Sequence, residues 1–274
     1  MKYLAFAFLY ATGISRLARW CNRKRVAILC YHGVTRRLTR PSQDPHGLHV
    51  RHHRFLAHLN YLKRHYRIIS LRDYLKTRRE GRSLPDYSVV LTFDDGFRNF
   101  FTTAAPSLDR EGVPVTLFLV TDWMREDDSG QPNSSWSSGD DETYLSWTEV
   151  QALRRNSNLE FGSHTCSHSN LPLLSIEETD RELRDSYKVL ASRLGERDPL
   201  PLAYPKGYYS TSIAQRAAQR GYTCALTTDE GLNDIHGDLF SLKRLLIGDD
   251  DAVPLFAARV SGLIGWLRSK IKSS

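Results

Sequence analysis

The stretch that decides the expected fold is Val89-Val-Leu-Thr-Phe-Asp-Asp-Gly96. Its apolar, β-branched and aromatic residues predict a buried strand, and the Asp-Asp-Gly that follows ends that strand abruptly. In parallel α/β folds the carboxyl ends of the strands form the ligand-binding face, so Asp94 and Asp95 are expected to point into a site. Asp-Asp-Gly is also common in ordinary turns, and this stretch alone fits both interpretations equally well.

Apolar runs of similar length alternate with helical patterns on both sides of this stretch. The predicted strands are residues 26–31, 67–70, 88–93, 115–120, 159–162, 201–204 and 224–228. Ser175 and Glu178 form a capping-box pattern, which predicts a helix that runs to about Leu194. About seven strand–helix units indicate an α/β fold with parallel strands, and they favour a barrel over an open sheet. The Ser- and Asp-rich residues 127–143 are expected to form a long loop, a place where binding residues are often found.

Composition places the chain among folded proteins and excludes several classes. The 274 residues are 41% hydrophobic and 25% charged, which speaks against disorder and fibrous repeats. No run reaches the ~18 consecutive apolar residues of a membrane-spanning helix. The four cysteines form no Cys-x-x-Cys pair, so zinc ribbons and a dense disulfide framework are excluded, while one isolated disulfide stays open.

Positive charge is concentrated at the two ends of the chain. The net charge is +7, but residues 1–25 hold six basic residues and no acidic one, and residues 254–274 hold four and none. The residues between them therefore carry three more acids than bases. A nucleic-acid-binding protein would more often place its basic surface on the folded body, so nucleic acid is not an expected partner. Basic ends suit an anionic membrane surface, and solvated tails are the alternative.

Both ends also contain apolar residues. Residues 3–14 are largely apolar, which fits a helix in the membrane interface, a signal peptide or a helix packed on the domain. We favour the first, because the five bases between Arg16 and Arg25 oppose export as a signal peptide. Near the C-terminus an apolar stripe at helical spacing is expected mainly to pack on the domain: Phe256, Val260, Leu263, Ile264, Leu267 and Ile271. The expected location is membrane-associated or in the cell envelope, on a side of the membrane that stays open.

A second motif, Ser163-His-Thr-Cys-Ser-His168, also follows directly after a predicted strand. On one helical turn, this spacing would bring the imidazoles of His164 and His168 to one face, as two ligands of one metal need. An aspartate with two histidines suits Zn²⁺, with Fe²⁺ or Mn²⁺ as alternatives. A further group of histidines follows no strand end and is not expected to bind a metal: His46, His49, His52, His53 and His58.

Three segments resemble the motifs of the polysaccharide deacetylase family (NodB homology, carbohydrate esterase family four): Thr92–Gly96, Ser163–His168 and Leu202-Ala-Tyr-Pro-Lys-Gly207. The resemblance extends from about Val26 to Ile247 and implies an incomplete or distorted (β/α)7 barrel, to which N- and C-terminal helices are added. It implies one divalent cation, with Zn²⁺ favoured over Fe²⁺, Mn²⁺ or Co²⁺. The implied roles are Asp95, His164 and His168 as metal ligands, Asp94 as general base, and the backbone N–H of Lys206 as an oxyanion donor.

The chain departs from the family pattern in two places. Ala203 stands where the third motif often has an arginine that orients the base, and we hypothesise that Arg244 supplies that guanidinium instead. The late Leu-x-His motif that supplies the general acid is also missing. Leu29-Cys-Tyr-His-Gly-Val34 is similar to the poly-β-1,6-N-acetylglucosamine deacetylase branch, in which the motif order is permuted and an early Tyr-His supplies the acid. We therefore prefer His32, which ends a predicted strand, over His236 as the acid.

These roles predict a hydrolase that removes N-acetyl groups from amino sugars of a polysaccharide or a lipid-linked glycan. Asp94 would take a proton from water and His32 would give one to the departing sugar nitrogen. Tyr204 is expected among the oxyanion- and substrate-binding residues together with Lys206. Of the aromatic residues that could stack on sugar rings, Tyr208 is preferred and Trp136 comes second, followed by Trp123, Tyr209 and Trp147; core packing is the default for Trp147. Hydrolysis of another amide or of an O-acetyl ester is an alternative. A non-catalytic glycan-binding protein is a further alternative, but binding alone needs no general base.

The expected organisation is an N-terminal helix over residues 1–25, a catalytic domain over 26–250 and a C-terminal amphipathic helix over 251–274. The expected partner is an N-acetylated glycan, and the oligomeric state is left open.

Overall fold

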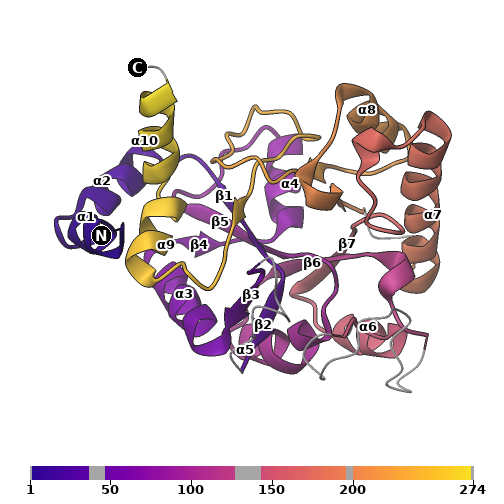
Figure 1. Ribbon diagram of the computed structural model, residues 1–274. Coiled ribbons are helices and arrows are strands. Elements are labelled where there is room, and N and C mark those ends of the chain that lie inside the picture. The colour runs from indigo at the N-terminus through magenta and orange to yellow at the C-terminus, as the bar shows by residue number, and fades with distance from the viewer. Residues whose placement is uncertain (1, 37–46, 127–142, 196–199, 273–274) are drawn as a thin grey trace.

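A curved parallel sheet with helices around it forms the centre of the protein (Figure 1). The computed structural model describes residues 2–36, 47–126, 143–195 and 200–272. Within them the strands of the main sheet are β1 (Ala27–Tyr31), β4 (Arg67–Ile68), β5 (Ser88–Phe93), β6 (Val115–Leu119), β7 (Leu159–Ser163), β8 (Leu202–Ala203), β9 (Ala225–Leu226) and β10 (Leu245–Leu246). Two further strands, β2 (Gly33–Thr35) and β3 (His49–Arg51), form a separate parallel pair.

The main sheet has the strand order β10-β1-β5-β6-β7-β8-β9, with β4 paired to the start of β5, and every pair is parallel. All residues of β1, β5 and β6 are buried, as expected when helices cover a parallel sheet. The seven strands predicted from apolar runs are all present, and the expectation of an incomplete (β/α)7 barrel is confirmed.

The segment Leu239–Ile247 spans the gap between the two edges of the sheet. Its Leu242 makes a parallel bridge to Leu226 of β9, and the N–H of Ile247 donates to the carbonyl of Cys30 on β1 at 2.9 Å. The segment therefore contains the edge strand β10, which pairs with β1, and it contacts β9 at the other edge. We call residues 239–247 the seam.

Helices pack around the sheet along the chain. They are α3 (His52–His65), α4 (Leu71–Arg79), α5 (Ala105–Arg110), α6 (Trp147–Leu153), α7 (Ile176–Leu194) and α8 (Thr211–Gln219), with short turns η1 (Phe100–Ala104), η2 (Thr121–Trp123), η3 (Leu171–Leu173) and η4 (Pro205–Gly207). The predicted capping box opens α7. The N–H of Glu178 donates to Ser175 Oγ at 3.2 Å, and the N–H of Ser175 donates to Glu178 Oε2 at 2.8 Å.

Four helices formed by the two ends of the chain lie together on one flank of the protein (Figure 1). They are α1 (Lys2–Ala11), α2 (Ile14–Cys21), α9 (Val253–Val260) and α10 (Leu263–Lys272). The expectation of one helix at each end was wrong, because Gly13 and Gly262 adopt φ of +80° and +79° and break each pattern in two. Packing of the C-terminal stripe on the protein is confirmed for four buried side chains: Phe256, Val260, Leu263 and Ile264. Among the described residues, none of the helices combines the length and apolar character needed to cross a bilayer.

Candidate active site

The carboxyl ends of three strands bring the predicted site residues to one level of the sheet. His32 follows β1, Asp94 and Asp95 follow β5, and His164 follows β7. Tyr31 pairs with Phe93, and Leu119 of β6 pairs with Ser163, so these ends lie in register across the sheet. Both carboxylates are buried, which an ordinary surface turn would not require and which agrees with the expectation that Asp-Asp-Gly opens into a site.

Asp95, His164 and His168 converge so that their ligand atoms all lie within 4.8 Å of one another. Oδ1 of Asp95 is 3.4 Å from Nε2 of His164 and 3.6 Å from Nε2 of His168. Nδ1 of His164 lies 2.7 Å from the carbonyl oxygen of Ala203, to which it donates, and this leaves Nε2 as the lone-pair nitrogen facing Asp95. Burial lowers the pKa of His168 to about 4, helped by the neighbouring His164, which keeps this imidazole neutral and able to bind a cation.

The helical turn expected between the two histidines is absent. Thr165 and His168 instead have φ of +67° and +61°, in the left-handed region, and the N–H groups of Cys166 and Ser167 donate to Glu182 Oε2 on α7 at 2.9 and 3.0 Å. In a helix these N–H groups would donate to backbone carbonyls of the preceding turn. Here the carboxylate of Glu182, which lies outside the loop, accepts them instead. The spacing of the histidines predicted their convergence correctly, but a loop anchored to α7 produces it.

Backbone strain is concentrated around Asp95, His164 and His168. Of the five non-glycine residues with positive φ in the described ranges, four belong to the motif loops: Asp95, Thr165, His168 and Lys206. Such conformations cost about 1–3 kcal/mol each and persist where the surroundings impose them. The strain therefore marks loops whose geometry is fixed by the fold.

The three converging residues fit a divalent cation. A carboxylate oxygen and two imidazole nitrogens are a donor set that Zn²⁺ favours, with room for further ligands. Oδ1 of Asp95 is buried and has no hydrogen-bond partner among the residues that the structure describes, although buried polar atoms normally have one. Burial acts to raise the pKa of Asp95, but the nearby His164 and the other imidazoles outweigh it, so this pKa lies below its usual value. An ionised oxygen without a donor is what a cation ligand requires.

Asp94 is held by Arg244 in a buried bidentate ion pair. Two guanidinium nitrogens lie 2.7 Å from the two carboxylate oxygens, and the Nε–H of Arg244 donates to the carbonyl of Thr227 at 2.8 Å. Burial acts to raise the pKa of Asp94, but the Arg244 charge overcomes it, so the pKa lies well below its usual value. Arg244 lies in the seam, and this contact supports the hypothesis that it replaces the arginine missing at Ala203.

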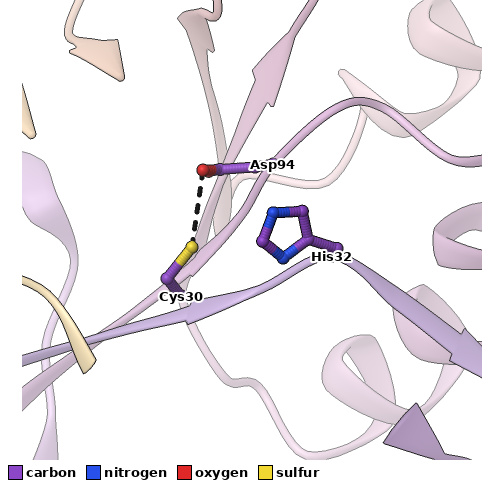
Figure 2. A group of neighbouring side chains, drawn as sticks. All are labelled: Cys30, His32 and Asp94. Carbon is purple, nitrogen blue, oxygen red and sulfur yellow. Dashed lines mark hydrogen bonds between the residues drawn. The ribbon is translucent and has the colours of Figure 1, made fainter. Parts of the chain in front are cut away.

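Cys30 is a neighbour of Asp94 that the sequence reasoning missed (Figure 2). Its Sγ lies 3.4 Å from Oδ2 of Asp94, and burial raises the pKa of the thiol well above its ordinary value, so the S–H donates to the carboxylate. Alternation along β1 places residues 30 and 32 on the same side of the strand, a signal that points to Cys30 once His32 is chosen. Cys30, His32 and Asp94 also converge within 4.8 Å, but Arg244 already occupies both Asp94 oxygens, so this group suits a cation less well than Asp95 and its histidines.

His32 lies beside both carboxylates, whereas His236 does not. Nε2 of His32 is 4.0 Å from Oδ2 of Asp95, and its Nδ1 is buried without a hydrogen-bond partner in the described ranges. Figure 2 shows the imidazole next to Asp94 and Cys30. His236 is exposed and lines a different hollow with Leu75 and Arg78 of α4. This arrangement favours His32 as the acid.

The residues predicted to contact substrate differ in how far they are exposed. Lys206 lies in η4 with φ of +57°, directly before Gly207, and Tyr208 is exposed immediately after η4. Tyr204 is fully buried, stacks on Tyr209 and donates its hydroxyl to the carbonyl of Phe240 at 3.0 Å. The expectation that Tyr204 belongs to the substrate-binding set was therefore wrong for its side chain, because packing and a hydrogen bond occupy it. Trp136 and most of the loop 127–143 lie outside the described residues.

Other expectations concern aromatic, histidine and cysteine side chains. The Trp123 ring lies 5.1 Å from His168, so it forms an apolar wall beside this histidine, while Trp147 is buried as expected of a packing residue. No metal-binding group of the described residues includes the histidines at 49, 52, 53 or 58, and His46 lies outside those residues. The four cysteines are free, so the isolated disulfide left open by the sequence is not formed.

A comparison with known protein families matches the part of the chain that carries Asp94, Asp95, His164 and His168. A family model described as polysaccharide deacetylase matches residues 81–225, more than half of the chain. The chain belongs to the polysaccharide deacetylase family. The match to the family model includes the strands that carry Asp94, Asp95, His164 and His168. It does not include β1 with His32 or the seam with Arg244.

Individual relatives of this polysaccharide deacetylase family member are distant in sequence. A poly-β-1,6-N-acetyl-D-glucosamine N-deacetylase of Escherichia coli (strain K12) is 26% identical over 208 residues, which is 66% of this chain and 31% of that protein. The chain thus spans about a third of the length of this curated relative. Similar folds include the Streptococcus pyogenes deacetylase PplD in complex with acetate (TM-score 0.73, 22% identity, 86% of this chain and 98% of that chain). Another is IcaB from Ammonifex degensii (TM-score 0.67, 20% identity, 87% and 97%).

Proposed function

We propose that this protein is a metal-dependent N-deacetylase that hydrolyses N-acetyl groups on amino sugars of a glycan. The observation that carries the proposal is the pairing of two adjacent carboxylates with different surroundings. Asp95 faces two imidazoles and has a buried oxygen without a donor, whereas Asp94 is held by a guanidinium and a thiol. One acid is thereby suited to a cation and its neighbour to proton transfer.

The three ligands Asp95, His164 and His168 would hold the cation, and Ala203 fixes the tautomer of His164 through its carbonyl. Bound there, a divalent cation would polarise the amide carbonyl and lower the pKa of the attacking water. Zn²⁺ is the ion we propose, because one carboxylate and two imidazoles match its usual ligands.

Proton transfer is assigned to Asp94 and His32. Asp94 accepts a proton as the water oxygen bonds to the carbonyl carbon, and Arg244 orients both of its carboxylate oxygens and keeps it ionised at neutral pH. His32 in its imidazolium form then donates a proton to the sugar nitrogen as the C–N bond breaks. Acetic acid and a free amine leave, and the acid ionises to acetate in solvent. Asp94 then loses the proton it accepted and His32 regains the proton it gave, so the protons balance.

The developing oxyanion needs a donor besides the cation. We assign this role to the backbone N–H of Lys206, whose left-handed conformation is set by the packing of the next residue, Gly207, against Thr228. The exposed Tyr208 after η4 is the proposed surface for a sugar ring, since an aromatic face can stack on a pyranose.

The substrate we propose is a β-1,6-linked N-acetylglucosamine chain, by similarity to the named activity of the Escherichia coli relative. A lipid-linked form of such a glycan and an O-acetyl ester are the alternatives. The glycan-binding alternative has less support, because a carboxylate held by a buried arginine beside a candidate cation site has no evident use in binding alone.

The test measures acetate release and metal content of the purified chain. Asp94→Asn should keep a bound cation but lower the rate of acetate release from β-1,6-N-acetylglucosamine oligomers by about 10²–10⁴-fold. Asp185→Asn, at a half-buried aspartate on α7, is the matched control and should keep wild-type activity. Equal acetate release by wild type and Asp94→Asn would overturn the mechanism, and release from O-acetylated sugars alone would favour the ester alternative. Glycan binding without acetate release by the metal-loaded wild type would favour the binding protein.

A further inference from the structure

Helix α2 presents its large apolar side chains to solvent and its small side chains to the protein. Ser15 is 2% exposed, Ala18 packs against the buried cluster of Ala258, Leu263 and Ile264, and Asn22 at the end of the helix donates to the carbonyl of Ser261 at 2.9 Å. On the other side Leu17 is 61% and Trp20 56% exposed. An amphipathic helix on a globular protein normally buries its apolar stripe, so the orientation of α2 is the reverse of the usual one.

Neighbouring helices extend this apolar surface. Of the ten large hydrophobic side chains exposed in the described ranges, six lie on α1, α2 and α10: Phe8, Ile14, Leu17, Trp20, Trp266 and Leu267. Helix α2 contacts both α1 and α10 on the flank where both termini lie (Figure 1). We call these six residues the terminal apolar face. Exposed apolar residues that gather in one region commonly mark an interaction site.

Basic residues border the terminal apolar face. Arg16 is exposed on α2 next to Leu17, whereas Arg19 is half-buried and packs over the rings of Tyr66 and Tyr87. Arg23, just after the helix, packs over the ring of Trp20. Arg25 follows the helix, and Lys270 lies exposed on α10. Acidic side chains balance this charge only in part. Asp86 pairs with Arg23 and Lys24, and Glu230 pairs with Arg268, while residues 1–25 contain no acid.

We propose that the terminal apolar face binds an anionic lipid surface, with α2 lying in the plane of the interface. Leucine and tryptophan side chains flanked by arginines are the composition of helices that insert between headgroups and acyl chains. Complementary charge favours this occupant, because the exposed Arg16, Arg25 and Lys270 attract anionic headgroups. A second copy of the chain is less suited, since a symmetric contact would bring the exposed basic side chains of the two copies together.

The experiment uses the full chain and vesicles, without any activity measurement. Sedimentation with phosphatidylcholine vesicles is compared with mixed phosphatidylcholine and phosphatidylglycerol vesicles over a series of KCl concentrations. We expect binding to the anionic vesicles, weakening as salt rises. The double variant Leu17→Ser/Trp20→Ser should bind at least about tenfold more weakly, because it loses two side chains that enter the interface. Arg16→Gln should weaken binding about fivefold.

A matched control comes from the same class of residues elsewhere on the surface. Leu173→Ser/Ile176→Ser also removes two exposed apolar side chains, near the start of α7, and should leave vesicle binding unchanged. Equal binding by both double variants, or no binding by the wild type, would overturn the proposal. A dimer in lipid-free solution that Trp20→Ser dissociates would assign the face to a second copy instead. Since neither metal nor acetate enters these measurements, their failure leaves the proposed deacetylase function untouched.

Discussion

At the scale of single residues, the buried ion pair of Asp94 and Arg244 places two opposite charges in the interior of the protein. Arg244 is fully buried, and its guanidinium contacts the carbonyl of Thr227, the hydroxyl of Thr92 and both oxygens of Asp94. Burying two charges is costly, and the mutual attraction only offsets this cost when the hydrogen bonds are complete. Removing one partner therefore affects more than proton transfer.

We expect Arg244→Met to lower the free energy of unfolding by about 3–5 kcal/mol, because Asp94 is left buried and unpaired. Urea unfolding at neutral pH measures this. The double variant Arg244→Met/Asp94→Leu should recover most of the loss, since no charge then remains without a partner. Arg184→Met breaks an exposed pair with Asp185 and should change stability by less than about 1 kcal/mol. A double variant no more stable than Arg244→Met would contradict this account.

At the scale of elements, η4 is the turn that depends most on a glycine. Gly207 has φ of +77°, and an added Cβ would lie 2.1 Å from Oγ1 and 2.4 Å from the backbone N of Thr228. The backbone that directs the Lys206 N–H is therefore pressed against the chain that follows β9.

Gly207→Ala should destabilise the protein by about 2 kcal/mol or more and lower acetate release further than that loss explains, because η4 must move away from Thr228. The control is Gly112→Ala, which has a similar φ of +61° but open space around its Cβ. This control should cost only about 1 kcal/mol and leave activity intact. Thermal unfolding and acetate release on both variants make the comparison, and equal effects would show that η4 is not constrained in this way.

The packing of α3 against α9 should make stability depend on pH. His58 on α3 is buried, stacks on Phe256 at 4.0 Å and contacts the carbonyl of Asp251 at 2.6 Å. Burial lowers its pKa to about 4, below the ~6.5 of an unfolded chain. As pH falls from about 6.5 toward 4, the unfolded chain takes up a proton at His58 that the folded protein does not. The free energy of unfolding therefore decreases over this range.

The stability of the wild type minus that of His58→Gln should therefore decrease by up to about 3 kcal/mol between pH 7 and pH 4. Other histidines with lowered pKa remain in both proteins and cancel in the difference. Urea unfolding at a series of pH values measures it. Parallel stability curves for the two proteins would refute the assignment to His58.

The sequence predicted elements better than it predicted loops. Apolar runs such as 88–93 and 115–120 became strands because buried parallel strands need little more than apolar, β-branched residues. The left-handed turns at Thr165 and His168 escaped prediction, since they depend on hydrogen bonds from Cys166 and Ser167 to Glu182 on α7. The Cys30–Asp94 contact and the burial of Tyr204 likewise depend on tertiary packing. Glycine breaks at Gly13 and Gly262 were visible in the sequence but were read as parts of continuous helices.

At the scale of the whole molecule, cation binding should be measurable as global stability. A ligand that binds only the folded state stabilises it by about 2.7 kcal/mol when its free concentration is about 100 times Kd. Removal of the metal with a chelator should therefore lower the midpoint of thermal unfolding, and added Zn²⁺ should restore it. Asp95→Asn should abolish most of this shift, whereas Asp94→Asn should retain it, because only Asp95 belongs to the proposed ligand set. An equal shift in both variants would place the cation elsewhere.

The late position of the seam, residues 239–247, in the sequence affects how the chain folds during synthesis. Arg244 is separated from Asp94 by 150 positions, so a ribosome delivers the carboxylate long before the guanidinium that neutralises it. A nascent chain that stops short of the seam would have to enclose a lone negative charge in its interior, at a cost of several kcal/mol. We therefore expect pairing of β10 with β1 and neutralisation of Asp94 to coincide late in synthesis, so that an unfinished chain lacks the arginine that orients the proposed base.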